Sequence, residues 1–172
     1  MLKAIKKKMK DQRGLTLVEL LAVVVILGII SAIAVPSIGG LIDNSKKDAH
    51  VGNAQQMVNA AKLATTADQG LLKGDDFLTL EYLISKGYLE TIKNPDKEGE
   101  YLDGDNPSAI LDTAPATGSY VKISNGKVVS VKLVTAQRGV QTEGSGPILV
   151  EDLKRDNVKP TPAPTPTPTT GG

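Results

Sequence analysis

The sequence contains no cysteine and no tryptophan, and its 172 residues include one histidine, one phenylalanine and four tyrosines. Without cysteine, disulfide bonds, thiolate metal sites and cysteine nucleophiles are excluded. An exported domain would therefore be held together by packing alone. Because aromatic side chains are so few, any soluble core must be small and mostly aliphatic.

Motifs that indicate catalysis are also missing from the sequence. There is no Gly-x-Ser-x-Gly, no phosphate-binding glycine loop and no histidine pair at metal-ligand spacing. The single histidine, His50, stands in a polar helical segment, and we expect it to be a solvated helix residue. We therefore expect no enzymatic activity.

Charge is distributed unevenly along the chain. Residues 1–14 hold six of the 20 Lys and Arg residues and one of the 19 Asp and Glu residues. The remainder is mildly acidic and shows no basic face of the kind that binds nucleic acids. A basic segment before an apolar helix stays in the cytoplasm, so we expect the N-terminus inside and everything after the helix outside.

The apolar run that follows, Leu15–Val35, has 21 residues. As a helix it would be about 31 Å long, which matches the hydrocarbon core of a bilayer. Glu19 lies near its start, although an ionised carboxylate inside a membrane costs about 2.5–3.5 kcal/mol on insertion scales. An acid in this position indicates a functional role, and we expect it to have a partner.

Three interpretations of this N-terminal segment compete. Residues 1–34 could be a secretory signal peptide ending at Ala32-Ile33-Ala34, as in a secreted or membrane-anchored binding module. The segment could be a permanent signal anchor, or the chain could be cut between Gly14 and Leu15. Composition alone favours the first two. The third is favoured by Gly14 directly before the apolar run, by Glu19 as the fifth residue after it, and by continuation into a helix without a loop.

The heptapeptide Gly14-Leu15-Thr16-Leu17-Val18-Glu19-Leu20 resembles the Gly-Phe-Thr-Leu-x-Glu-Leu motif of the type IV pilins and their relatives, the pseudopilins of type II secretion and competence systems. Gly28 and Pro36 stand where many members have a helix-softening glycine and proline. Leu15 departs from the phenylalanine that is usual in the family.

This resemblance implies a precursor in the cytoplasmic membrane. A prepilin peptidase would remove the leader between Gly14 and Leu15 and methylate the new amine on Leu15. Glu19 would pair with that amine on a neighbouring subunit. An inner-membrane assembly platform and motor would then build a homo-oligomeric surface filament for adhesion, motility or DNA uptake. The alternative within the family is a pseudopilin.

After Pro36 the pattern becomes amphipathic, with two adjoining stripes at helical spacing. The first stripe is Ile38, Leu41, Ile42, Ser45, Ala49, Gly52, Gln56, Ala60 and Leu63, and the second is Val51, Ala54, Val58 and Ala61. We expect one helix from Leu15 to about Thr66, with a membrane half at 15–35 and an amphipathic half at 36–66. Pro36 and Gly39-Gly40 predict a bend or local unwinding.

Residues 67–158 are predicted to form an α+β head. We expect a helix from Asp76 to Lys86 that ends at Gly87, and a loop-rich stretch with short strands near Tyr101 or Ile110. A hairpin at 119–135 is predicted to have a three-residue loop that pairs Val121 with Val129. Gly146–Glu151 would add a third strand to a small antiparallel sheet, which covers the amphipathic half of the long helix.

Two further predictions concern loops. The acidic segment 96–106 offers oxygen ligands suited to calcium, with Asp103 and Asp105 as the first candidates, although its spacing is not that of an EF-hand. No other cofactor is expected. Residues 159–172 alternate proline with small residues and are predicted to be a disordered tail of polyproline II character.

Overall fold

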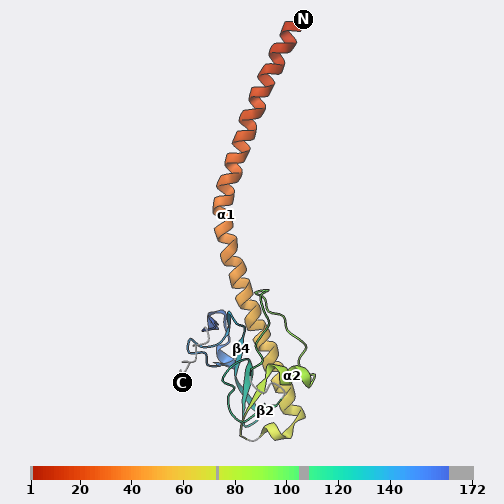
Figure 1. Ribbon diagram of the computed structural model, residues 1–172, viewed down its shortest axis with the longest axis vertical. Coiled ribbons are helices and arrows are strands. Elements are labelled where there is room, and N and C mark those ends of the chain that lie inside the picture. The colour runs from red at the N-terminus through yellow and green to blue at the C-terminus, as the bar shows by residue number, and fades with distance from the viewer. Residues whose placement is uncertain (1, 73, 105–108, 163–172) are drawn as a thin grey trace, which may run out of the picture. The chain divides into compact units, whose positions relative to one another are not determined.

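The computed structural model describes residues 2–72, 74–104 and 109–162 (Figure 1). Its first element, helix α1, runs over Leu2–Ala67, so it begins within the basic leader and ends one residue beyond the predicted Thr66. The chain divides into two compact units, one up to Asp43 and one from Asn44 onward, and α1 contributes to both.

In the first unit, α1 continues through Pro36 and through Gly39 and Gly40. Of the two predicted alternatives, local unwinding is therefore wrong, and the bend stays a prediction. Pro36 removes one backbone hydrogen bond, but the turns on both sides consist mainly of aliphatic residues that keep their own bonds. Helix propagation adds one bond for each residue fixed, so a single gap does not end the helix.

The second unit is built on an antiparallel sheet with the order β2-β1-β3-β4-β5-β7, and β6 also pairs with β4. The α+β prediction of a long helix against a small antiparallel sheet is confirmed. The elements after α1 are η1 Gln69–Leu72, β1 Asp75–Thr79, α2 Leu80–Ser85, β2 Ile110–Leu111, β3 Tyr120–Ser124, β4 Lys127–Val134, β5 Arg138–Val140, β6 Ile148–Leu149, η2 Val150–Asp152, η3 Arg155–Asn157 and β7 Val158–Pro160.

The helix predicted from Asp76 to Lys86 is wrong in its first third, because Asp75–Thr79 forms strand β1 between β2 and β3. Helix α2 begins only at Leu80. Thr79 has an extended backbone, and its hydroxyl oxygen accepts a hydrogen bond from the Tyr82 N–H at 3.1 Å, which makes it the N-cap. Gly87, at φ +74°, has the left-handed conformation expected after the helix.

The β3–β4 hairpin corrects the predicted three-residue loop. Ser124 pairs with Lys127 across a two-residue turn, in which Asn125 and Gly126 have φ values of +49° and +74°. This matches the type I′ turn that Asn-Gly favours. A β-bulge then shifts the register, so Val121 faces Val131 rather than Val129. The bulge reconciles the preferred turn with apolar residues on one face.

Strand β6 confirms the third strand predicted in Gly146–Glu151, although it is shorter. Strand β2 lies at Ile110 as expected, whereas Tyr101 is in no strand. The tail predicted from residue 159 begins too early, because β7 pairs Lys159 with Gly139 and Pro160 with Arg138. Since β7 is an edge strand, the missing N–H of Pro160 is tolerated. The prediction of disorder for 163–172 lies outside the described residues.

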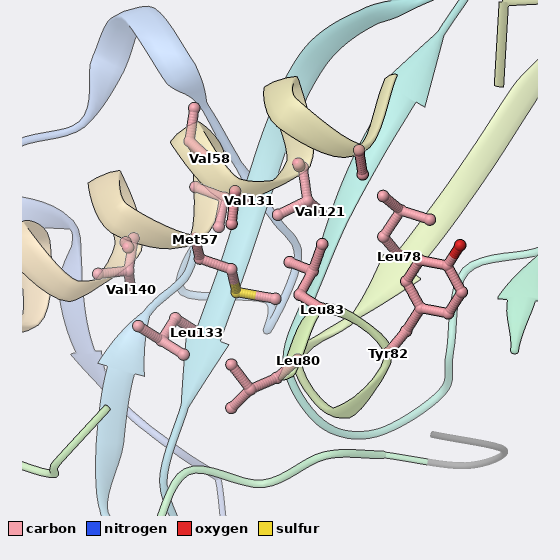
Figure 2. Close-up of a cluster of buried hydrophobic side chains, with 14 of the residues drawn as sticks. Met57, Val58, Leu78, Leu80, Tyr82, Leu83, Val121, Val131, Leu133 and Val140 are labelled. Carbon is pink, nitrogen blue, oxygen red and sulfur yellow. The ribbon is translucent and has the colours of Figure 1, made fainter. Parts of the chain in front are cut away.

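The core lies between the sheet, α2 and the second half of α1. Figure 2 shows Met57 of α1 extending toward Leu133 of β4 and Leu83 of α2, and all three are fully buried. Each such side chain contributes about 1.5–3 kcal/mol by leaving water. The other buried apolar residues of α1 are smaller: Ala54, Val58, Ala60, Ala61 and Ala64. Small side chains allow the sheet to approach the helix backbone closely.

Gly139 provides a test of how closely β5 approaches β4. A Cβ at Gly139 would lie 2.2 Å from the Leu133 carbonyl oxygen and 2.5 Å from the Val134 Cα, whereas a Cβ at Gly144 meets nothing within 4 Å. We expect Gly139→Ala to lower the free energy of unfolding by at least about 2 kcal/mol. The control Gly144→Ala should stay within about 0.5 kcal/mol. Denaturant unfolding in detergent, followed by near-UV circular dichroism, measures both, and equal midpoints would contradict this packing.

Candidate functional site

In the first unit, the large apolar side chains from Leu17 to Ile42 are all 48–70% exposed. By length and composition, α1 is the one helix in the described residues that could cross a membrane. An exposed apolar surface this continuous is unstable in water. It needs either lipid or other apolar helices around it.

Glu19 is the only ionisable residue between Leu17 and Ile42, and it is exposed on this apolar surface. Gly14 and Leu15 precede it within the backbone of α1. Gly28 and Pro36 follow it in the same helix, and the space beside Gly28 is open. The residues predicted from the motif therefore lie in sequence on one continuous helix.

In the second unit, the two predicted stripes of α1 have different environments. The stripe of Val51, Ala54, Val58 and Ala61 packs against the core. Most of the other stripe remains exposed, although it was expected to contribute to the same apolar face, and only Ala60 of its members in this unit is buried. Its exposed members are Ser45, Ala49, Gly52, Gln56 and Leu63. We call these five residues the free stripe.

His50 contradicts its prediction, because its side chain is fully buried rather than solvated. Its Nε2 lies 2.9 Å from the Asp96 Oδ2, and its Nδ1 lies 2.9 Å from the Tyr101 hydroxyl. The His50 and Tyr101 rings also meet edge to face at 5.6 Å. One sequence signal was available: His50 stands four residues before Ala54 and seven before Met57, on the buried face of the helix.

Asp96 joins His50 to the sheet. It accepts two hydrogen bonds from Arg138 of β5, one of them from Nε at 2.7 Å, and the Lys46 Nζ lies 3.6 Å away. The Arg138 guanidinium and the His50 imidazole hold the pKa of the Asp96 carboxyl well below its usual range. We call the group of Lys46, His50, Asn53, Asp96, Tyr101 and Arg138 the His50 cluster.

The calcium prediction is not resolved by the described residues. Asp105 lies outside them. Asp103 is partly buried, and burial together with Glu81 and Glu100 raises its pKa. Among the described residues, no group of three or more His, Asp or Glu side chains is arranged to hold a metal ion. Calcium binding by segment 96–106 remains a prediction.

The Asp96–Arg138 pair gives a test of the His50 cluster. Asp96→Asn would remove the charge of the carboxylate that accepts two hydrogen bonds from Arg138, whose side chain is 18% exposed. Breaking a buried pair costs about 3–5 kcal/mol, and because this pair is part-buried we expect the free energy of unfolding to fall by up to about 3 kcal/mol. The control Asp48→Asn breaks an exposed pair with Arg155, whose side chains are 52% and 46% exposed, and should change nothing measurable. Thermal unfolding in detergent compares the two, and equal losses would contradict a special role for Asp96.

Comparison with known proteins relates the helix to a described motif. Residues 9–35 match the family model of the prokaryotic N-terminal methylation motif. The chain is 29% identical to a "Fimbrial protein" of Pseudomonas aeruginosa over 151 residues, which are 87% of this chain and 84% of that protein. It is 28% identical to the "Type IV major fimbrial protein FimA" of Dichelobacter nodosus over 135 residues, 74% of this chain and 78% of that protein. No solved structure matches it significantly.

Proposed function

The chain belongs to the type IV pilin family, and on that premise we propose that it is the precursor of a structural pilus subunit that polymerises through α1. One observation carries the proposal. Between Leu17 and Ile42 the helix exposes an almost entirely apolar surface, with Glu19 as its single charge. Such a surface suits storage in a bilayer and later packing against identical helices.

The proposed processing begins with the leader. Cleavage between Gly14 and Leu15 by a prepilin peptidase would remove the basic residues, and methylation would follow on the new amine of Leu15. The motif match over residues 9–35 supports this step. The mature chain would then bring two opposite charges into the membrane, the Leu15 ammonium and the Glu19 carboxylate.

We propose that Glu19 pairs with the Leu15 ammonium of a neighbouring subunit. A lone charge in hydrocarbon is costly, and each group relieves the cost of the other. Lipid can surround the aliphatic side chains of α1, but it offers no partner to Glu19. A second subunit offers both an apolar surface and a cationic partner, so the Glu19 charge favours association over storage in the membrane.

The free stripe supports an extension of this contact beyond the membrane segment. Apart from Gln56 its members are small or apolar, and the core of the second unit leaves them exposed. Small residues let helices approach closely. Gly28 and Pro36 are proposed to soften the helix, since each weakens helical bonding at its position.

The proposed location follows from the same features. The precursor would stand in the cytoplasmic membrane with its N-terminus inside, and an assembly platform and motor would move it into a surface filament. Adhesion, motility or DNA uptake would belong to that filament. The two relatives are both named fimbrial proteins, which favours a pilus over the pseudopilus of a secretion or competence system.

Glu19→Gln tests the charge pair because it removes the charge and keeps the shape. We expect at least tenfold fewer sheared filaments, which corresponds to a loss of about 1.4 kcal/mol or more per contact. Glu19→Asp, which keeps the charge, should assemble better than Glu19→Gln. Immunoblots of sheared surface material give the yield, and mass spectrometry of the mature N-terminus should find methylated Leu15 in all variants.

The outcomes distinguish the parts of this proposal. Normal filament yield from Glu19→Gln would refute the charge pair. A mature chain that starts at Val35 would indicate a signal peptide and sink the pilin function. An intact leader would favour a membrane-anchored module instead.

Gly52 tests the free stripe. It lies exposed on α1, and a Cβ there meets nothing within 4 Å. Gly52→Leu should therefore keep or raise the free energy of unfolding, since leucine favours a helix over glycine by up to about 1 kcal/mol. If neighbouring helices pack against the stripe, Gly52→Leu lowers filament yield and Gly52→Ala does so much less. Equal yields from both variants and the parent chain would remove the free stripe from the interface.

A further inference from the structure

The His50 cluster joins three parts of the second unit. Lys46, His50 and Asn53 come from α1, and Arg138 comes from β5. Asp96 and Tyr101 come from residues 90–101, which contain no helix or strand. We call these twelve residues the clamped segment. Because the clamped segment forms no β-strand hydrogen bonds, side-chain contacts to α1 and β5 hold much of its length in place.

The hydrogen bonds of the cluster suit a neutral His50. Asn53 Nδ2 donates to the Lys93 carbonyl oxygen at 3.0 Å, and because that oxygen can only accept, the orientation of the Asn53 amide is set. The same nitrogen donates to the Tyr101 hydroxyl oxygen at 2.9 Å. The ionised Asp96 carboxylate can only accept, so His50 Nε2 carries a hydrogen and donates to it. The Tyr101 hydroxyl, which accepts from Asn53, can donate its own hydrogen to His50 Nδ1. Every bond is satisfied by a neutral imidazole with its hydrogen on Nε2.

A second proton on His50 does not fit this arrangement. It would sit on Nδ1 and turn this atom from an acceptor into a donor, so the Tyr101 hydroxyl would have to rotate its hydrogen away and lose the bond that it donates. The charge would also be poorly balanced, since Arg138 already neutralises Asp96 and Lys46 lies nearby. Since the imidazole is fully buried, water cannot solvate the charge without local opening.

We propose that the His50 cluster is a pH-operated latch, which holds the clamped segment on α1 while His50 is neutral and releases it when His50 takes up a proton. Burial lowers the pKa of His50 despite the hydrogen bond to Asp96, and Arg138 and Lys46 lower it further. A lowered pKa means that the stabilisation is complete above the unfolded-state value of about 6.5 and is lost as the pH falls below it. Asp96, with its own lowered pKa, stays ionised throughout that window.

The latch would act on the exterior of the subunit. The clamped segment lines a cleft beside α2, where Ile92, Lys97 and Glu100 face Glu81 and Ile84. Release of the segment would change the shape and charge of that surface in mildly acidic surroundings. This inference stands on the cluster itself and does not depend on how the chain assembles.

The full-length protein in detergent micelles provides the test. His50 is the only histidine, so its imidazole resonances can be assigned without ambiguity, and NMR titration gives its pKa directly. We expect a value below the reference of about 6.5. Hydrogen exchange of the clamped segment, corrected for intrinsic rates, should rise at least about fivefold between pH 7.5 and pH 5, while the buried turns of α1 keep their protection.

Two variants separate the latch from a merely structural role. In His50→Gln, the amide can donate to Asp96 and accept from Tyr101 but cannot titrate, so the clamped segment should stay protected at both pH values. In Tyr101→Phe, the bond that favours neutral His50 is lost, so the pKa of His50 should rise. A parent pKa at or above 6.5, or equal acid-induced exchange in His50→Gln, would overturn the proposal. If His50→Gln does not fold, the parent titration and Tyr101→Phe decide.

Discussion

The second unit depends on one packing contact, the face of α1 around Met57 against the inner face of the sheet. Val121, Val131 and Leu133 on the sheet are all fully buried there, and α1 contributes mostly alanine and valine around Met57. The chain has no disulfide and almost no aromatic residue on this helix, so the contact depends on the close approach of α1 to the sheet rather than on large side chains. The β-bulge before Ile123 serves the same contact, because it keeps Val121 and Val131 on the inner face after a two-residue turn.

Polar contacts complete the unit where apolar packing cannot. The clamped segment carries proline, glycine and charged residues, so it can form neither a buried strand nor an amphipathic helix. Arg138 and Asp96 fix it to the sheet, and His50 and Asn53 fix it to α1. A part-buried ion pair of this kind adds less to stability than its Coulomb energy indicates, because both charges lose some of their water. Its stronger effect is to specify one position for a segment that would otherwise have several.

Features that depend on local sequence could be predicted, and features that depend on distant partners could not. The helical period gave α1 to within one residue at its C-terminal end, and Asn125-Gly126 located the hairpin. The helical period could not predict which of the two adjoining stripes of α1 meets the sheet, since both carry enough apolar residues to be buried. The period also groups Phe77 with the residues of α2, although pairing with β2 and β3 makes Asp75–Thr79 a strand. The burial of His50 has a local signal in its spacing from Ala54 and Met57, but its partners could not be predicted, because Asp96 and Arg138 lie 46 and 88 residues away in sequence. By contrast, the motif around Glu19 is contiguous and could be recognised directly.

The two faces of α1 separate folding from the proposed assembly. The face that includes His50 and Met57 is satisfied inside the subunit, whereas the free stripe and the surface around Glu19 are left for an outside partner. The core of the second unit, as far as the structure describes it, comes from one chain, so on the proposed function a subunit could fold before it assembles. Lipid satisfies the aliphatic side chains nearly as well as another helix does, so apolar contact alone favours neither state strongly. On the proposed function, the equilibrium between the membrane and the filament then depends on two features. One is the Glu19 carboxylate, which lipid cannot neutralise, and the other is the close approach of helices that residues as small as Gly52 permit. On the proposed function, Glu19 is therefore the group that favours assembly, because a neighbouring subunit offers it a cation and lipid does not.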